Sequence, residues 1–250
     1  MRNKLANTMN VKRFVAGTIA LEERGAREAS MLLVVGEPGY GKTEVVEWWA
    51  DTKDAIYLCG KPGLTPKIVL GDLVRELGEQ PDATYEKRLQ QADRLLRTRQ
   101  TPIILDEAQF YLIDRAAPLE VVRSLTDRYE LSLVLVSMDR IHETIVKFEQ
   151  ISSRIAAVVK MTAATVDDVR VCCDTLCEVK IAEDLVEEIH FHTNGRYREI
   201  INAIALAERF GKRGKLEVVT RAAMAGEVIA HDWRDETPRK VRPPRNTRAA

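Results

Sequence analysis

Long hydrophobic runs are missing from this sequence, and none approaches the ~20 residues that a membrane-spanning helix requires. The first residues, MRNKLANTMNVKRF, lack the apolar stretch and small-residue cleavage site of a signal peptide. Cysteine is scarce, with four in 250 residues and no CxxC pair. We therefore expect a globular protein of the cytoplasm that makes no membrane contact. Cys59, Cys172, Cys173 and Cys177 are expected to be packed or inert thiols.

Net charge is also absent, since 38 basic residues balance 38 acidic ones, but the charges are unevenly distributed. Residues 1–14 carry four basic residues and no acid, and residues 238–250 carry five and no acid. Basic ends on a mildly acidic body suggest contact with nucleic acid or with an acidic partner. Solvated, disordered ends are the alternative.

Short apolar runs alternate with longer amphipathic segments, which is the pattern of a parallel sheet covered by helices. The runs lie at 31–35, 55–59, 102–106 and 131–136, with a weaker fifth at 157–160. Helices are predicted between them at about 43–51, 66–77, 84–98, 118–129 and 139–149. The fold class is therefore α/β, with a doubly wound parallel sheet.

After Met161 the strand signals stop, and segments near 165–178, 181–192, 196–210 and 215–228 read as helices. The predicted organisation is a basic N-terminal segment at 1–14, an α/β core at 15–161, a small helical lid at 162–230 and a basic, disordered tail at 231–250. The tail is rich in proline and charge and has little to bury.

A phosphate-binding pattern follows the first strand. The sequence G-x-x-x-x-G-K-[ST] occurs between an apolar strand and a helix, which is the context that a P-loop requires. The glycines let successive backbone N–H groups point at phosphates, Lys42 is expected to reach the β and γ phosphates, and the Thr43 hydroxyl to bind Mg²⁺. The predicted ATP-binding residues are Gly36, Glu37, Pro38, Gly39, Tyr40, Gly41, Lys42 and Thr43.

A second element, the apolar strand 102–106, ends in two acids. Asp106 is expected to hold Mg²⁺ or one of its waters. Glu107 then orients or deprotonates the attacking water, so hydrolysis is expected and not binding alone. A helix cap is the alternative for an isolated Asp-Glu pair.

Three weaker positions complete the predicted site. Ser137 ends the strand at 131–136 and is placed to bind the γ-phosphate or the water, unless it is simply a strand-end serine. Arg154 precedes the fifth strand and is a candidate arginine finger for a neighbouring subunit, or else a surface arginine. Arg198 or Arg196, in GRYR, is a candidate to reach the phosphates.

In order, the sequences GEPGYGKT, IILDEAQ, a strand ending in LVS, SSRI and GRYREIINAI resemble Walker A, Walker B, sensor 1, arginine finger and sensor 2 of AAA+ ATPases. More narrowly, DEAQ, the compact size and the minimal lid resemble the transposition ATPases, the family of transposition protein B of Mu-like phages. The resemblance covers about residues 10–228. One departure is that the phage Mu protein has an N-terminal DNA-binding domain, whereas about 25 residues precede the first strand here.

This resemblance implies ATP and Mg²⁺ as cofactors and assembly into a homo-oligomer, either a ring or a helical filament, on double-stranded DNA. It also implies delivery of target DNA to a DDE transposase that stimulates hydrolysis, with Arg154 acting in trans. DNA contacts are then expected at Lys61, Thr65 and Lys67, in a surface loop with two glycines and two prolines. An ordinary charged loop is the alternative.

Two other functions fit the same core. One is a replication initiator or helicase loader, although no winged-helix domain follows the predicted lid. The other is a protein-remodelling or secretion-associated ATPase, although the sequence has no clear aromatic-glycine pore loop.

Overall fold

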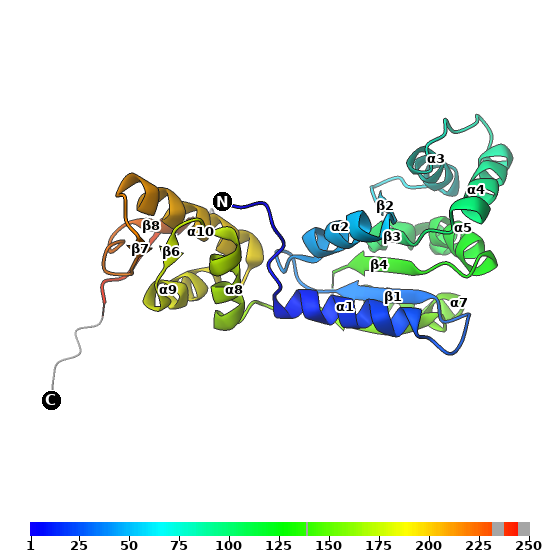
Figure 1. The fold of residues 1–250 in the computed structure, drawn as a ribbon. Helices are drawn as coiled ribbons and strands as arrows, with labels where there is room; N and C mark the ends of the chain where they lie inside the picture. The colour runs from blue at the N-terminus through cyan, green and yellow to red at the C-terminus, as the bar shows by residue number, and fades with distance from the viewer. Residues whose placement is uncertain (139, 232–237, 245–250) are drawn as a thin grey trace. The chain divides into compact units, whose positions relative to one another are not determined.

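The computed structural model describes residues 1–138, 140–231 and 238–244, which fall into two compact units (Figure 1). The core unit comprises Arg13–Pro38 and Lys42–Met161. The second unit comprises Met1–Lys12, Gly39–Gly41 and Thr162–Ala250. Among the described residues, no helix is long and apolar enough to cross a membrane.

A five-stranded parallel sheet organises the core unit, in the order β2-β3-β4-β1-β5. Its strands are β1 (Met31–Val35), β2 (Ile56–Cys59), β3 (Ile103–Asp106), β4 (Leu133–Ser137) and β5 (Ile155–Lys160). The three inner strands are buried along their whole length, as expected when both faces of a parallel sheet are covered. The predicted α/β class and parallel sheet are confirmed.

Helices connect these strands. They are α1 (Met9–Glu22), α2 (Lys42–Lys53), α3 (Pro66–Glu76), α4 (Tyr85–Arg99), the 3₁₀ turn η1 (Ala108–Tyr111), α5 (Ile113–Arg128), α6 (Ile141–Ile145) and α7 (Glu149–Ser152). Thr65 and Thr84 begin α3 and α4, each accepting a hydrogen bond from a backbone N–H of the first turn.

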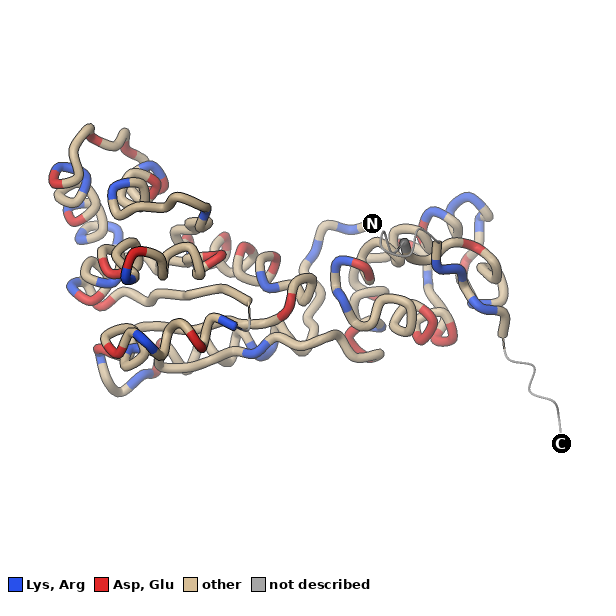
Figure 2. Tube along the Cα trace, turned by 180° about the vertical axis from the view of Figure 1, so that it is seen from behind, with Lys and Arg blue, Asp and Glu red and all other residues tan. Residues whose placement is uncertain are grey.

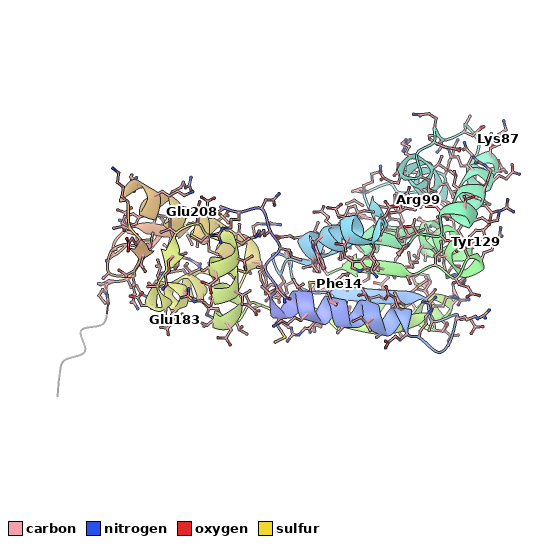
Figure 3. The ribbon with its side chains drawn as sticks, viewed as in Figure 1. Phe14, Lys87, Arg99, Tyr129, Glu183 and Glu208 are labelled. Carbon is pink, nitrogen blue, oxygen red and sulfur yellow. The ribbon has the colours of Figure 1, made fainter. Side chains whose placement is uncertain are left out.

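Helix α1 was not anticipated, because only the charge of residues 1–14 was considered there. Its helical signal lies in the spacing of Phe14, Thr18 and Leu21, which are buried on one face. The ring of Phe14 packs edge-on against Trp49 of α2, with 5.9 Å between ring centroids (Figure 3). Gly17 faces the sheet, where an added Cβ atom would lie 2.4 Å from Val159, so glycine permits the close approach of α1.

The strand register brings the carboxyl ends of the inner strands to one edge of the sheet. Val35 pairs with Ser137, and Asp106 pairs with Cys59 on the neighbouring β2. Because parallel strands all end at the same edge, the loop after β1, the acids after β3 and the serine of β4 converge there. This edge carries the candidate active site.

The second unit is built on three helices around its own apolar core: α8 (Val166–Leu176), α9 (Glu183–Thr193) and α10 (Tyr197–Arg213). A capping box formed by Thr165 and Asp168 begins α8. The pairs β6 (Lys180–Ile181) with β7 (Val218–Val219), and β8 (Val228–His231) with β9 (Pro238–Lys240), complete it.

The helix predicted at 215–228 is wrong, because turns and the short strand β7 occupy that segment. Lys215 and Gly226 have φ values of 50° and 85°, in the left-handed region that interrupts a helix. The apolar residues Val219 and Met224 of this segment are buried without forming a helix.

Three of the four cysteines are buried in the second unit. Cys172, Cys173 and Cys177 contribute to its apolar core, and burial raises the pKa of the Cys173 thiol above its usual range. A buried thiol that stays protonated is a packing residue and a poor nucleophile. Cys59, on β2, is exposed.

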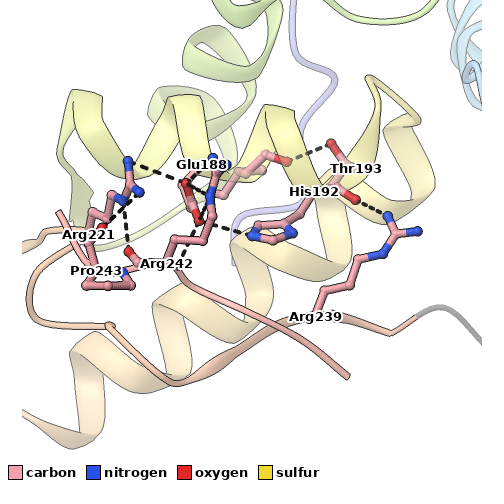
Figure 4. Close-up of polar contacts among 8 residues, drawn as sticks. Glu188, His192, Thr193, Arg221, Arg239, Arg242 and Pro243 are labelled. Carbon is pink, nitrogen blue, oxygen red and sulfur yellow. Dashed lines mark hydrogen bonds and ion pairs between the residues drawn. The ribbon is translucent and has the colours of Figure 1, made fainter. Parts of the chain in front are cut away.

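The predicted disorder of residues 231–250 is wrong for residues 238–244, which are anchored to α9 (Figure 4). The buried carboxylate of Glu188 accepts hydrogen bonds from Arg242 Nη2 at 2.7 Å, from the Arg242 backbone N–H at 2.8 Å and from His192 Nε2 at 3.0 Å. The guanidinium of Arg242 also lies 3.6 Å from the centroid of the Phe191 ring. Residues 232–237 and 245–250 of the predicted tail lie outside the described residues.

This cluster makes stability depend on the charge of Glu188. Burial by itself would raise the pKa of Glu188, but the hydrogen bonds from Arg242 and His192 outweigh it and lower the pKa to about 2. A carboxylate with a depressed pKa in the folded state stabilises the protein above its unfolded pKa of about 4.3. That contribution is lost as the pH falls from about 4.3 towards about 2.

We predict that Glu188→Gln lowers the free energy of unfolding by about 3 kcal/mol at pH 7, because Arg242 loses its buried partner. The difference from the native protein should shrink as the pH falls below about 4. Urea unfolding followed by circular dichroism, at pH 7 and at lower pH, measures the free energy of unfolding of both proteins and its dependence on pH. The control is Glu183→Gln on the same helix, whose carboxylate is exposed and pairs with Arg170. Equal stability of the two variants would contradict the assignment.

Candidate active site

The loop Gly36–Thr43 leads from the carboxyl end of β1 into the first turn of α2. Gly36 is so closely packed that an added Cβ atom would lie 2.8 Å from the carbonyl oxygen of Met161. Gly39 and Gly41 have φ values of 89° and 81°, which side chains rarely adopt. All three glycines of the motif are thus required by the backbone that curls at the end of β1.

The ammonium group of Lys42 lies against this loop. Lys42 Nζ donates hydrogen bonds to the carbonyl oxygens of Gly36 at 2.6 Å and Glu37 at 3.0 Å. The N-terminus of α2 adds the partial positive charge of its N–H groups. The loop therefore combines a fixed cation with backbone donors, which is the chemistry that binds polyphosphate.

Asp106 is 4% exposed and is held by three donors. Its Oδ2 accepts hydrogen bonds from Thr43 Oγ1 at 2.9 Å and from Tyr57 Oη at 2.7 Å, and its Oδ1 accepts one from the Glu107 backbone N–H at 2.7 Å. The structure thus brings the predicted metal-binding pair Thr43 and Asp106 together across β1 and β3.

This donor set fits Mg²⁺. The hydroxyl of Thr43 donates its hydrogen bond to Asp106, so the lone pairs of its oxygen are left for a cation. Mg²⁺ prefers a few oxygen ligands from the protein and fills its other positions with water and phosphate oxygens. A hydroxyl oxygen and an adjacent carboxylate beside a phosphate loop match that preference.

Glu107 has a different environment from its neighbour. Its backbone is left-handed, with φ 51° and ψ 47°, and the side chain is half-buried. Gln109 Nε2 donates to Glu107 Oε2 at 2.5 Å, and Gln109 Oε1 accepts a hydrogen bond from Ser137 Oγ at 2.7 Å. The predicted residues Glu107 and Ser137 are therefore linked through the side chain of Gln109.

Two residues of this site were not anticipated. Gln109 is the glutamine of the DEAQ sequence that carries the family resemblance. Its position two residues after Glu107 is the sequence feature that could have identified it. Tyr57 had no signal, since a tyrosine in a strand usually reads as packing. Burial and the hydrogen bond to Asp106 raise the pKa of Tyr57 above its usual range, so the phenol remains a donor.

The structure does not bring Arg154 to the phosphate loop of its own chain. Arg154 immediately precedes β5, and its carbonyl oxygen accepts a hydrogen bond from Met31 N–H at the start of β1. Arg154 therefore lies at the amino end of β1, whereas the phosphate loop follows the carboxyl end of that strand. The two ends of a five-residue strand are about 16 Å apart. Its guanidinium donates to Asp127 Oδ2 at 2.9 Å and to the Gln150 carbonyl at 2.6 Å.

Arg196 and Arg198 differ within the second unit. Arg198 is exposed, whereas the side chain of Arg196 runs along Gly39, at 3.7 Å from the position of an added Cβ atom. Tyr40, also in this unit, accepts a hydrogen bond at its carbonyl from Asn10 Nδ2 at 3.2 Å. Of the two arginines, Arg196 is the one that contacts a residue of the phosphate loop.

Two of the three candidate DNA contacts have local partners. Lys61 Nζ pairs with Asp72 Oδ2 at 3.1 Å, and Thr65 is the N-cap of α3. Lys67 is exposed. In Figure 2, basic and acidic residues are interspersed around α3 and α4, which agrees with ion pairs such as that of Arg94 with Glu79.

Comparisons with known proteins find the same fold elsewhere. Residues 25–145 match the family model of the AAA domain. The fold is similar to that of Cdc6p from Pyrobaculum aerophilum, with a TM-score of 0.62 and 15% identity over 89% of this chain and 66% of that one. It is also similar to Orc1 from Aeropyrum pernix in complex with DNA (TM-score 0.56, 18% identity, 87% and 63% covered).

The Holliday junction branch migration motor RuvB of Thermotoga maritima is similar as well (TM-score 0.55, 17% identity, 84% and 64% covered). The chain has the P-loop AAA+ fold.

The AAA+ fold and the AAA domain match support nucleotide binding and hydrolysis in general. No curated protein matches the sequence. The chain spans 63–66% of the length of the three solved structures, so the activities of those whole proteins are not carried over. The narrower resemblance to transposition ATPases receives no support from these comparisons.

Proposed function

We propose that this protein is a Mg²⁺-dependent ATPase that works as an oligomer on double-stranded DNA. The observation that carries the ATPase part is the hydrogen bond from Thr43 to Asp106, which joins the phosphate loop to the strand that ends in Asp106-Glu107. This pairing places the hydroxyl oxygen of Thr43 and the carboxylates of Asp106 and Glu107 next to the phosphate-binding loop.

Each residue then has a role in hydrolysis. The loop N–H groups and Lys42 bind the β and γ phosphates, and Thr43 and Asp106 hold the cation or its waters. Mg²⁺, when bound, neutralises charge that develops on the phosphate oxygens. Glu107 orients the attacking water and accepts its proton, and Ser137 donates to the γ-phosphate or the water. Arg196 is a better candidate than Arg198 for a nucleotide-sensing arginine.

Arg154 is proposed to act in trans. It lies at the opposite edge of the sheet from Gly36, so it can serve only the site of a second copy of the chain. To do so, its guanidinium must leave Asp127, where half-buried pairing holds it. An arginine supplied by a neighbour stabilises the transition state and makes hydrolysis depend on assembly.

The DNA part of the proposal rests on the basic ends and on the resemblance in sequence. Among proteins with a similar fold, Orc1 was solved in complex with DNA and RuvB is a Holliday junction motor. Lys61 and Lys67 are proposed phosphate contacts, because the exposed pair of Lys61 with Asp72 is weak and can open. Delivery of target DNA to a DDE transposase is the specific role proposed, and replication initiation or helicase loading is the alternative.

Subunit mixing tests the ATPase site and Arg154 together. We predict that Arg154→Ala and Glu107→Gln each bind ATP but are almost inactive alone. A mixture should recover up to about a quarter of native turnover, because a Glu107→Gln subunit still supplies its arginine to an intact neighbouring site. Arg128→Ala, which removes an exposed arginine paired with Asp93, is the control and should keep full activity. A mixture that stays inactive would contradict action in trans.

Electron microscopy with ATP and non-specific duplex DNA tests the assembly. We predict rings or helical filaments on the duplex, with affinity that falls steeply as salt rises. The double variant Lys61→Ala, Lys67→Ala should bind less tightly and with a shallower salt dependence than Lys87→Ala, which changes an exposed lysine of α4 (Figure 3).

Absence of any DNA-bound assembly would contradict the proposal. If DNA-bound assemblies form but a DDE transposase does not stimulate their ATP hydrolysis, the alternative of replication initiation or helicase loading is favoured.

A further inference from the structure

A phenol reaches the metal-binding carboxylate of this site from the edge of the sheet. Tyr57 lies on β2, the strand next to β3, and is the second residue of that strand. In the register of the two strands Cys59 pairs with Asp106, and Tyr57 is two residues before Cys59. Residues two apart in a strand share a face, so the long Tyr57 side chain extends along the face on which Asp106 lies.

The contact of Tyr57 is directed at one oxygen. Tyr57 Oη donates to Asp106 Oδ2 at 2.7 Å, and Thr43 Oγ1 donates to the same oxygen at 2.9 Å. With the Glu107 N–H on Oδ1, three of the roughly four lone-pair positions of the carboxylate are occupied. Asp106 is 4% exposed, so water does not replace these donors freely.

From this geometry we propose that Tyr57 is a positioning residue for divalent metal binding at the nucleotide site. The inference rests on the proposed Mg²⁺-ATPase function and adds a residue to it. Without Tyr57, one neutral donor on Oδ2 is lost and the carboxylate can rotate about its terminal torsion, which has a broad energy minimum. With Tyr57 in place, Oδ2 stays directed at Thr43.

The chemistry of a phenol suits this role. Lysine or arginine at this position would bring a positive charge next to the metal and repel it. A phenol donates a hydrogen bond without adding charge and stays protonated near neutral pH. Tyr57 therefore orders Asp106 without competing with a cation.

The test is the affinity for ADP, measured by isothermal titration once in excess Mg²⁺ and once in EDTA. The gain in affinity that Mg²⁺ provides should fall about three- to tenfold in Tyr57→Phe, the usual effect of one hydrogen bond, while the affinity in EDTA stays unchanged. Tyr129→Phe is the matched control, since it removes the hydroxyl of a tyrosine at the end of α5, outside this site.

A double-mutant cycle separates positioning from general damage. In an Asp106→Asn background, Tyr57→Phe should cause no further loss of the Mg²⁺-dependent gain. If Tyr57→Phe kept the full Mg²⁺-dependent gain in ADP affinity, or lost as much ADP affinity in EDTA as in Mg²⁺, this inference would be overturned while the proposed function stood. If the native protein binds no ADP under either condition, the proposed function fails, and this inference fails with it.

Discussion

The hydrogen bond between Thr43 and Asp106 is the interaction on which the proposed chemistry depends. It joins the end of the phosphate loop to the end of β3, although β4 lies between β1 and β3 in the sheet. The bond forms because parallel strands end at one edge and because glycines let the loop return over that edge. It also orients the hydroxyl of Thr43, which donates its hydrogen bond to the carboxylate and keeps its oxygen lone pairs available to a cation.

The two adjacent acids, Asp106 and Glu107, have different surroundings, and these suit the different roles proposed for them. Asp106 is buried and occupied by three donors, whereas Glu107 is half-buried, left-handed in backbone and held through Gln109 to Ser137. A carboxylate that is held by three donors and keeps a lone-pair position open suits a fixed ligand, whereas a carboxylate held by the side chain of Gln109 can be released to meet a water molecule. Hydrogen bonds through Gln109 thus connect Ser137, which we propose meets the γ-phosphate, with Glu107, which we propose activates water.

Much of this architecture could be predicted from sequence, because the signals were local. The phosphate loop was recognisable from Gly36, Lys42 and Thr43 between an apolar strand and a helix, and the inner strands from their continuous apolar runs. The helix predicted at 215–228 is wrong because nothing in the residue types there reveals the left-handed backbone at Lys215. The order of residues 238–244 could not be predicted, because Arg242 depends on Glu188, more than 50 residues away in the sequence. Tyr57 was missed for the same reason, since its partner is fixed by strand pairing and not by spacing along the chain.

The most direct test of the central claim is the effect of Mg²⁺ on binding of a non-hydrolysable ATP analogue to the native protein and to Thr43→Val. Valine keeps the shape of threonine but removes the hydroxyl that donates to Asp106 and offers its oxygen to the metal. We expect Mg²⁺ to tighten binding to the native protein, and Thr43→Val to lose at least about tenfold of that gain in affinity. If Mg²⁺ did not affect the native protein, or if Thr43→Val kept the full gain, the account would be contradicted.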